Sequence, residues 1–366
     1  MGFNCGIVGL PNVGKSTIFN ALTRGKAEAA NYPFCTIDPN VGIVPVSDHR
    51  LKEINQICPA EKVIMTTVEI VDIAGLVKGA SSGEGLGNQF LTHIAETDAI
   101  LEVVRVFQDD NIIHVAGSVD PARDVDIIKT ELMLKDIDTL QKALDRTAKA
   151  SKSGDKKAKE MADAVTKTMD ALNKGKTVRK ADLSPEEREL VRTLSLLTQK
   201  PILYVANVSE KEIQSGHDSP AVKTLKDIAA AEGSTAILIS GKIEEEISQL
   251  DEAEKDEYLK SMGLQESGLD RLVREGHKLL ELISFFTSGP KENRAWTVRK
   301  GSRAPQAAGK IHSDFERGFI RAEVIAYNDF LAYKGEAGAR TAGRLRVEGK
   351  EYVVQDGDLM HFRFGV

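Results

Sequence analysis

The run Gly9-Leu10-Pro11-Asn12-Val13-Gly14-Lys15-Ser16 fits the phosphate-binding pattern G-x-x-x-x-G-K-[ST] without a mismatch. Glycines let backbone N–H groups gather around a polyphosphate, and the N-terminus of a following helix adds the positive end of its dipole. An apolar run at 3–8 precedes the motif, and residues 17–22 have the apolar spacing of a helix. This succession of strand, loop and helix predicts a site for a nucleoside triphosphate.

The residues of this motif have distinct expected roles. Lys15 should reach the β- and γ-phosphates and take part in catalysis, and the Ser16 hydroxyl should be a ligand of Mg²⁺. Further contacts to the nucleotide are expected from Asn12, Val13 and Gly14, and from Thr17 directly after the motif.

Two downstream segments carry groups that would complete the phosphate and metal site. The first is the loop 31–36, where Thr36 is placed to bind Mg²⁺ and to sense the γ-phosphate, as in a nucleotide switch. The second is Asp72-Ile73-Ala74-Gly75, a D-x-x-G sequence at the end of the apolar, β-branched run 64–71. Asp72 should hold the Mg²⁺ shell, and the Gly75 N–H should bond the γ-phosphate. The predicted metal ligands are therefore Ser16, Thr36 and Asp72.

Two later loops are predicted to meet the base. The apolar run 201–206 ends in Asn207-Val208-Ser209-Glu210, and the run 235–239 ends in Ser240-Gly241-Lys242. A P-loop GTPase carries N-K-x-D and S-A-K at these places. The aspartate of N-K-x-D accepts hydrogen bonds from N1–H and the 2-amino group of guanine, but Glu210 is one methylene longer and Val208 replaces the lysine. Adenine lacks the 2-amino donor, so ATP loses nothing, although Glu210 could still read guanine after a small shift of the loop.

Length and charge place these motifs in a larger chain. The 366 residues exceed one ordinary compact domain, and the formal net charge is -6. Two zones are nevertheless basic: residues 142–180 hold 12 Lys/Arg against 5 Asp/Glu, and residues 291–366 hold 14 against 10. Such zones on an acidic protein indicate an anionic partner such as RNA, although the lysines of 142–180 could equally well solvate a long helix.

Composition also indicates a cytoplasmic protein without a membrane segment. No apolar run approaches the roughly 20 residues that span a bilayer. The chain begins with a core strand, so no signal peptide is expected. The cysteines Cys5, Cys35 and Cys58 show no paired spacing, which favours reduced thiols.

The pattern of elements predicts an α/β protein with two additions. Residues 1–123 and 200–285 should form a nucleotide-binding domain with a mixed, mostly parallel sheet. Between them, residues 124–199 show helical spacing broken at Gly154, which predicts an inserted antiparallel coiled-coil arm with a basic tip. A third helix should begin at Ser184. Residues 288–366 have short alternating runs and one amphipathic helix over 306–315, which predicts a small β-grasp domain.

With these motifs in order, the chain resembles the YchF subfamily of Obg-related P-loop NTPases over essentially its full length. The residues that carry the resemblance are 9–16, 31–36, 72–87, 207–210 and 308–316. The last of these runs is similar to a TGS domain, named for threonyl-tRNA synthetase, GTPases and SpoT, and such domains are associated with RNA or ribosome contact. The resemblance implies a protein that binds ribosomes and hydrolyses ATP more readily than GTP.

The resemblance also bears on single residues. It implies that Asn207 and the Val208 backbone contact adenine. Many GTPases carry a water-orienting glutamine after D-x-x-G, but Leu76 stands there and cannot orient water. The nearby candidates are His93, in an expected helix over 88–97 where a structural role is favoured, and His114, in the loop 109–114. Since the family uses a histidine from this loop, we take His114 as the catalytic residue.

Three functions are compatible with these features. The first is a ribosome-associated ATPase whose nucleotide state controls its binding to ribosome or RNA partners. The second is a nucleotide-gated RNA- or protein-binding module in which hydrolysis is incidental. The third is a GTP-preferring GTPase.

Overall fold

The computed structural model describes residues 3–24, 40–73, 86–109, 111–112, 114–152 and 155–365. Two compact units divide the chain, the first built from 3–43 and 69–272 and the second from 44–68 and 273–366. This division differs from the ranges expected from sequence, because 44–68 and the residues from 273 onward belong with the C-terminal part. Within the described residues, no helix is both long and apolar enough to cross a membrane.

The first unit contains a six-stranded sheet in the order β2-β4-β1-β5-β6-β7. Its strands are β1 (Phe3–Val8), β2 (Val41–Pro45), β4 (Thr67–Asp72), β5 (Ala99–Arg105), β6 (Ile202–Asn207) and β7 (Thr235–Ile239). The pairs β1–β5, β5–β6 and β6–β7 are parallel. Every residue of β5 and β6 is buried, as the near-continuous apolar runs of a parallel sheet require. The predicted α/β class with a mostly parallel sheet is confirmed.

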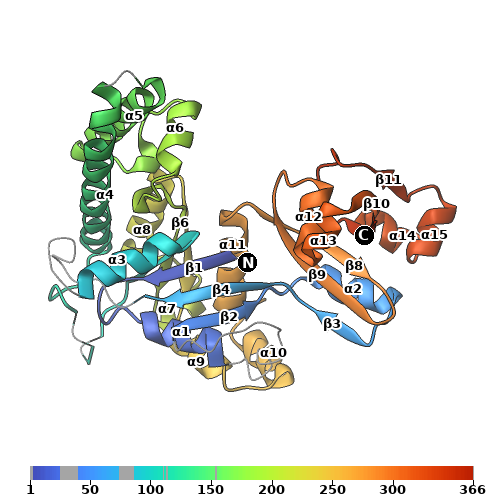
Figure 1. Cartoon of the computed structure of the whole chain (residues 1–366). Helices are drawn as coiled ribbons and strands as arrows, with labels where there is room; N and C mark the ends of the chain where they lie inside the picture. The colour runs from blue at the N-terminus through green and yellow to red at the C-terminus, as the bar shows by residue number, and fades with distance from the viewer. Residues whose placement is uncertain are drawn as a thin grey trace. The chain divides into compact units, whose positions relative to one another are not determined.

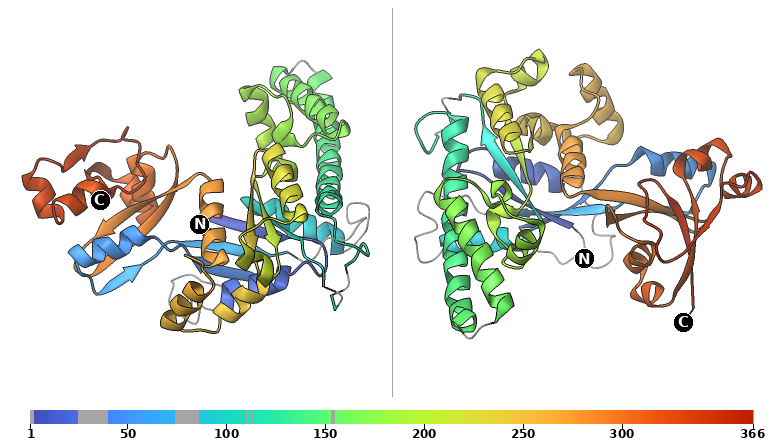
Figure 2. Two further views of the ribbon diagram at one scale, coloured as in Figure 1. Left: turned by 180° about the vertical axis from the view of Figure 1, so that it is seen from behind. Right: turned by 90° about the horizontal axis from the view of Figure 1, so that it is seen from above.

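Helices cover both faces of this sheet. Helices α1 and α9 pack together on one face, and α4 and α8 pack together on the other (Figures 1 and 2). The helices outside the arm are α1 (Lys15–Arg24), α3 (Leu86–Glu96), α7 (Glu210–Ser215), α8 (Pro220–Ala231), α9 (Gly241–Ile247), α10 (Glu252–Ser261) and α11 (Gly268–Leu279).

The described part of the inserted segment contains helices joined by turns and short loops, and no strand. Two long helices, α4 (Pro121–Lys152) and α5 (Lys156–Asn173), lie side by side in all views (Figures 1 and 2). They are followed by η2 (Val178–Lys180), α6 (Pro185–Arg192) and η3 (Leu197–Gln199). Apolar residues spaced along α4 and α5, such as Leu140 and Val165, share one core with α6. Ser184 caps α6 with a capping box, as its sequence predicted, whereas the supercoil of a coiled coil stays a prediction.

The second unit contains a sheet in the order β11-β10-β12-β8-β9-β3. Its strands are β3 (Lys62–Ile64), β8 (Leu282–Ser288), β9 (Glu292–Arg299), β10 (Phe319–Ile325), β11 (Arg346–Glu348) and β12 (Leu359–Phe364). Its helices are α2 (His49–Ile57), α12 (Ala304–Ile311), α13 (Ser313–Arg317), α14 (Tyr327–Ala332) and α15 (Glu336–Thr341). Phe285 joins a core with α12, and its neighbour Phe286 joins another with α2 and α14, so alternate residues of β8 serve two cores.

Two expected elements are wrong in detail. The run 64–71, read as one strand, is divided between β3 in the second sheet and β4 in the first. The single helix expected over 306–315 is divided at His312, whose backbone is extended and whose side chain caps α13. The β-grasp assignment of the second unit stays a prediction.

Candidate nucleotide-binding site

A cavity of about 760 Å³ lies at the carboxyl ends of β1, β5, β6 and β7. Ligands of open α/β sheets bind at this edge, because the loops that follow parallel strands converge there. The lining comes from four segments: the motif with the start of α1, the loop after β5, the loop after β6, and the loop after β7 with the start of α9. Its members are Leu10, Pro11, Asn12, Val13, Gly14, Lys15, Ser16, Thr17, Phe107, Gln108, Asp109, Ile112, Asn207, Val208, Ser209, Glu210, Ser240, Gly241, Lys242 and Glu245. Nearly all of the predicted nucleotide contacts are therefore brought together.

The phosphate-binding loop depends on two left-handed residues, Asn12 with φ of 63° and Gly14 with φ of 93°. A β-carbon at Gly14 would lie 2.1 Å from Nδ2 of Asn207, so only glycine fits this turn. The carbonyl of Gly14 accepts the N–H of Ile18 at 3.1 Å, which begins α1 directly after the loop. The first helical turn, residues 15–17, lines the cavity, and a helix N-terminus favours an anion there.

Lys15 and Asp72 are in direct contact. Lys15 Nζ donates to Asp72 Oδ1 at 2.6 Å, and the two side chains are 10% and 18% exposed. The contact arises because β4 lies next to β1 in the sheet, so the end of β4 meets the loop after β1. The structure thus joins the predicted phosphate-binding lysine to a predicted metal ligand.

The remaining metal and γ-phosphate groups are only partly described. Thr36, Gly75 and Leu76 lie outside the described residues. Among the described residues, no cluster of three or more His, Cys, Asp or Glu side chains could hold a metal ion. Magnesium in nucleotide sites usually takes one or two protein oxygens together with phosphates and water. The Ser16 hydroxyl and the Asp72 carboxylate fit a magnesium ion that arrives with a nucleotide.

Asn207 connects three loops around the cavity. Its Nδ2 donates to the carbonyl of Val13 at 2.8 Å, and its Oδ1 accepts the N–H of Gly241 at 3.1 Å. The side chain is buried, so both bonds are shielded from water. The resemblance implied a contact of Asn207 with adenine. In the structure, the Asn207 side chain instead links the phosphate loop to the loop after β7.

The pairing of Glu210 was missed by sequence analysis. Lys242 Nζ lies 2.9 Å from Glu210 Oε1, and both residues line the cavity. Its hydrogen bond to the Glu210 carboxylate raises the pKa of Lys242. Val208 and Ser240 also line the cavity; both are buried, and Val208 N donates to the carbonyl of Ile239 at 2.9 Å. The signal in the sequence was the basic residue one position after the Ser240-Gly241 loop.

His114 does not line the cavity in this structure. Its side chain is 4% exposed, and Nε2 lies 3.0 Å from Oδ2 of Asp124, at an angle outside hydrogen-bond geometry. Nδ1 accepts the N–H of Ala116 at 3.2 Å, which leaves Nε2 facing the carboxylate. The other candidate, His93, lies exposed on α3. A catalytic role for His114 therefore requires the loop that carries it to move.

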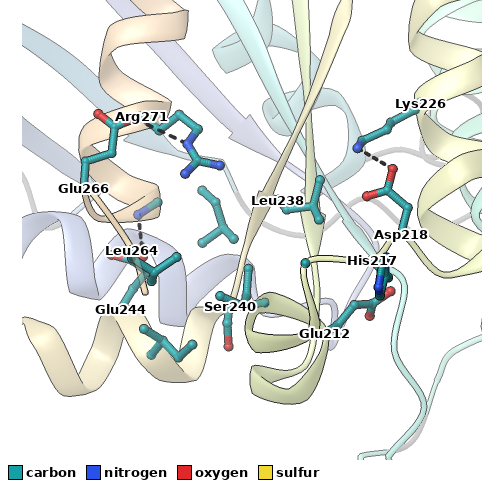
Figure 3. Close-up of a pocket in the computed structure, with 15 residues that line it drawn as sticks. Glu212, His217, Asp218, Lys226, Leu238, Ser240, Glu244, Leu264, Glu266 and Arg271 are labelled. Atoms are coloured by element: carbon teal, nitrogen blue, oxygen red, sulfur yellow. Dashed lines mark hydrogen bonds and ion pairs between the residues drawn. The ribbon is translucent and has the colours of Figure 1, made fainter. Parts of the chain in front are cut away.

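A second cavity has a volume of about 220 Å³, and Figure 3 shows the side chains that line it. Ser240 lines both cavities. Glu244 lies at one end, where its Oε1 accepts the N–H of Gly268 at 2.7 Å and so fixes the start of α11. Burial raises the pKa of Glu244 to about 7, against the opposing effect of backbone N–H donors. The Lys226–Asp218 ion pair lies at the other end.

The fold and this phosphate loop define a P-loop nucleoside triphosphatase of the GTPase type. Two family models match the chain: one described as "50S ribosome-binding GTPase" over residues 4–129, and "YchF-GTPase_C", described as a protein of unknown function, over residues 282–365.

Curated relatives match along the whole chain. A protein of Escherichia coli O157:H7 named "Ribosome-binding ATPase YchF" is 54% identical over 366 residues, and one of the same name from Bacillus subtilis (strain 168) is 53% identical, each with 100% of both chains covered. The solved structure of the Schizosaccharomyces pombe YchF GTPase matches with a TM-score of 0.89 and 40% identity, covering 99% of this chain and 98% of that one. The chain belongs to the YchF family.

Proposed function

We propose that this chain is a ribosome-binding ATPase whose nucleotide state controls its attachment to the ribosome. The observation that carries the proposal is the cavity lined by the phosphate loop, Lys15, Asn207 and Glu210, with Asp72 bonded to Lys15. The relatives named above support the ribosome as partner and ATP as substrate. Since ribosomes work in the cytoplasm, we place the protein there.

The preference for adenine over guanine follows from the ion pair that Glu210 makes with Lys242. A guanine clamp needs a carboxylate free to accept two N–H groups from one base edge. Here Oε1 of Glu210 lies 2.9 Å from a lysine ammonium, and the side chain is already one methylene too long. Adenine makes no such demand, so the Glu210–Lys242 pair weakens GTP binding and leaves ATP binding intact.

Binding of the triphosphate would separate Lys15 from Asp72. The ammonium of Lys15 is attracted by the denser negative charge of the β- and γ-phosphates, and the Asp72 carboxylate is freed for the metal. Ser16, Thr36 and Asp72 are the proposed ligands of Mg²⁺, which when bound neutralises charge on the phosphates. The Gly75 N–H is proposed to bond the γ-phosphate.

His114 is proposed to orient the attacking water. In the described state its Nε2 faces Asp124, so the loop must first release it. A slow basal turnover follows, because the catalytic side chain spends most of its time away from the phosphates.

A calorimetric titration tests the choice of base. ADP should bind at least roughly tenfold more tightly than GDP, a difference of about 1.4 kcal/mol. Replacement Lys15→Ala should weaken both nucleotides, which shows that they share the phosphate loop. Tighter binding of GDP would favour the GTPase alternative and contradict the reading of Glu210.

Sedimentation with purified ribosomes tests the partner. The chain should pellet with ribosomes, the pelleted fraction should depend on the nucleotide supplied, and ribosomes should accelerate ATP turnover. Nucleotide-dependent pelleting without any acceleration would instead support the gated binding module.

A further inference from the structure

We propose that Arg105 positions one wall of the nucleotide cavity, formed by Phe107, Gln108, Asp109 and Ile112, and thereby sets the affinity for the nucleoside part of the nucleotide. The inference rests on the proposed nucleotide site and adds a residue to it. Arg105 does not line the cavity itself, so its role is positioning rather than contact.

The side chain of Arg105 is wrapped by this wall. Its Nε donates to the carbonyl of Phe107 at 3.0 Å, Nη2 to that of Asp109 at 3.1 Å, and Nη1 to that of Ile112 at 2.9 Å. The guanidinium also lies over the ring of Phe107, 4.8 Å from its centroid. One side chain therefore holds this wall at Phe107, Asp109 and Ile112.

Because Arg105 is buried, its guanidinium needs hydrogen-bond acceptors from the protein. Arg105 is 2% exposed and is among the largest fully buried side chains of the described residues. A buried cation is costly unless its donors are satisfied, and here carbonyl oxygens satisfy them. The planar guanidinium can reach three divergent oxygens, whereas the single ammonium of a lysine cannot. The conformation of the wall and the burial of Arg105 therefore depend on each other.

The place of Arg105 in the sheet explains why the wall matters for the nucleotide. Arg105 ends β5, which lies between β1, followed by the phosphate loop, and β6, followed by the base loop. It pairs in register with Asn207, and Val106 N donates to the carbonyl of Asn207 at 3.1 Å. Phe107, Gln108, Asp109 and Ile112 all line the cavity.

These positions separate the wall from the phosphate cradle. The cradle is made by the loop after β1 and the first turn of α1, neither of which Arg105 contacts through a hydrogen bond among the described residues. Disturbing the wall should weaken contacts to base and ribose and leave the phosphate contacts in place.

Calorimetric titration of two ligands distinguishes the wall from the cradle. The ligands are ADP, which needs both, and inorganic tripolyphosphate, which needs only the cradle. Arg105→Lys should weaken the binding of ADP by roughly tenfold, which is equivalent to the loss of one charged hydrogen bond. Arg105→Met should weaken ADP binding further. Tripolyphosphate should stay within about twofold of the wild type, because the phosphate loop is untouched.

The matched control is Arg50→Lys in the second unit. Arg50 is also mostly buried, and it pairs with Asp48 at 2.7 Å and Asp356 at 2.9 Å. Replacing Arg50 by lysine should leave the affinities for ADP and for tripolyphosphate unchanged. Amide hydrogen exchange gives a second measurement: exchange across 107–112 should accelerate in Arg105→Lys and stay unchanged in Arg50→Lys. If Arg105→Met does not fold, the titrations and the amide hydrogen exchange of Arg105→Lys are sufficient to test the proposal.

Three outcomes would overturn the inference. Unchanged ADP affinity in Arg105→Lys would show that the wall does not depend on the guanidinium. Equal loss of both ligands would show a general loss of structure. Wild-type protein that binds neither ligand would refute the proposed function together with this inference, whereas the first two outcomes leave the proposed function intact.

Discussion

Replacing Glu102 by glutamine should make the protein more stable at alkaline pH. Glu102 lies in the middle of β5, is 1% exposed, and has no hydrogen-bond partner for Oε1 among the described residues. It faces a small cavity of about 20 Å³ at the base of the arm, lined also by Thr177, Arg179 and Glu232. Burial raises the pKa of Glu102 to about 8, although the nearby Arg179 opposes the shift.

The sign and size of the effect follow from this pKa. The unfolded chain releases the Glu102 proton near pH 4.5, whereas the folded chain keeps it until about pH 8. Between these values folding must bind a proton, so the free energy of unfolding falls as pH rises, by about 1.4 kcal/mol per pH unit and about 5 kcal/mol in all. A glutamine keeps the size and a hydrogen-bond donor of the neutral acid but cannot ionise.

Urea unfolding followed by circular dichroism measures this difference. From pH 6 to pH 8.5 the advantage of Glu102→Gln over the wild type should grow by about 2.5 kcal/mol, because the slope levels off above pH 8. The control is Glu189→Gln, whose side chain is 66% exposed and pairs with Arg192, and it should show no such growth. An advantage that stays constant across this pH range would mean that Glu102 is ionised in the fold, and the reasoning from burial would fail.

Two further predictions concern the nucleotide site. Gly14→Ala combines a left-handed φ of 93° with a β-carbon 2.1 Å from Asn207, so it should displace that amide and weaken ADP by roughly a hundredfold or more, as titration would show. Asp124→Asn removes the charge that faces His114 at 3.0 Å, so basal ATP turnover should rise a few-fold at unchanged ADP affinity. A fall in turnover would show instead that Asp124 supports His114 during catalysis.

How much of the site could be predicted depended on the range of the interactions involved. The phosphate loop is set by local geometry, namely a strand, a positive φ at Gly14 and a helix start, and all three are visible in consecutive residues. The loops after β6 and β7 follow equally regular strands, so Asn207, Val208, Glu210 and Ser240 could be placed at the cavity in advance. Their mutual contacts could not, because these depend on how the loops approach one another.

The fold shows the same limit. The run 64–71 contains neither Pro nor Gly to mark a break, so its division between two sheets depends on what each half packs against. β3 pairs with β9 from a distant part of the chain, over the register Lys62 with Glu292 to Ile64 with Arg294. This pairing is also why the residues 44–68 belong with the C-terminal unit.

The two charged residues of β5 illustrate what sequence reasoning can recognise without being able to explain. A glutamate and an arginine in a strand that is otherwise apolar contradict the pattern of a buried parallel strand, and such contradictions mark functional or strained positions. The structure gives each a different physical setting: Arg105 is satisfied by carbonyl oxygens of the loop it holds, and Glu102 is left with an unpaired oxygen at the base of the arm. The end of this strand thus carries the proposed positioning residue of the nucleotide wall, and its middle carries a buried carboxyl that faces a cavity lined in part by the arm, so changes at either site act on the same element of the sheet.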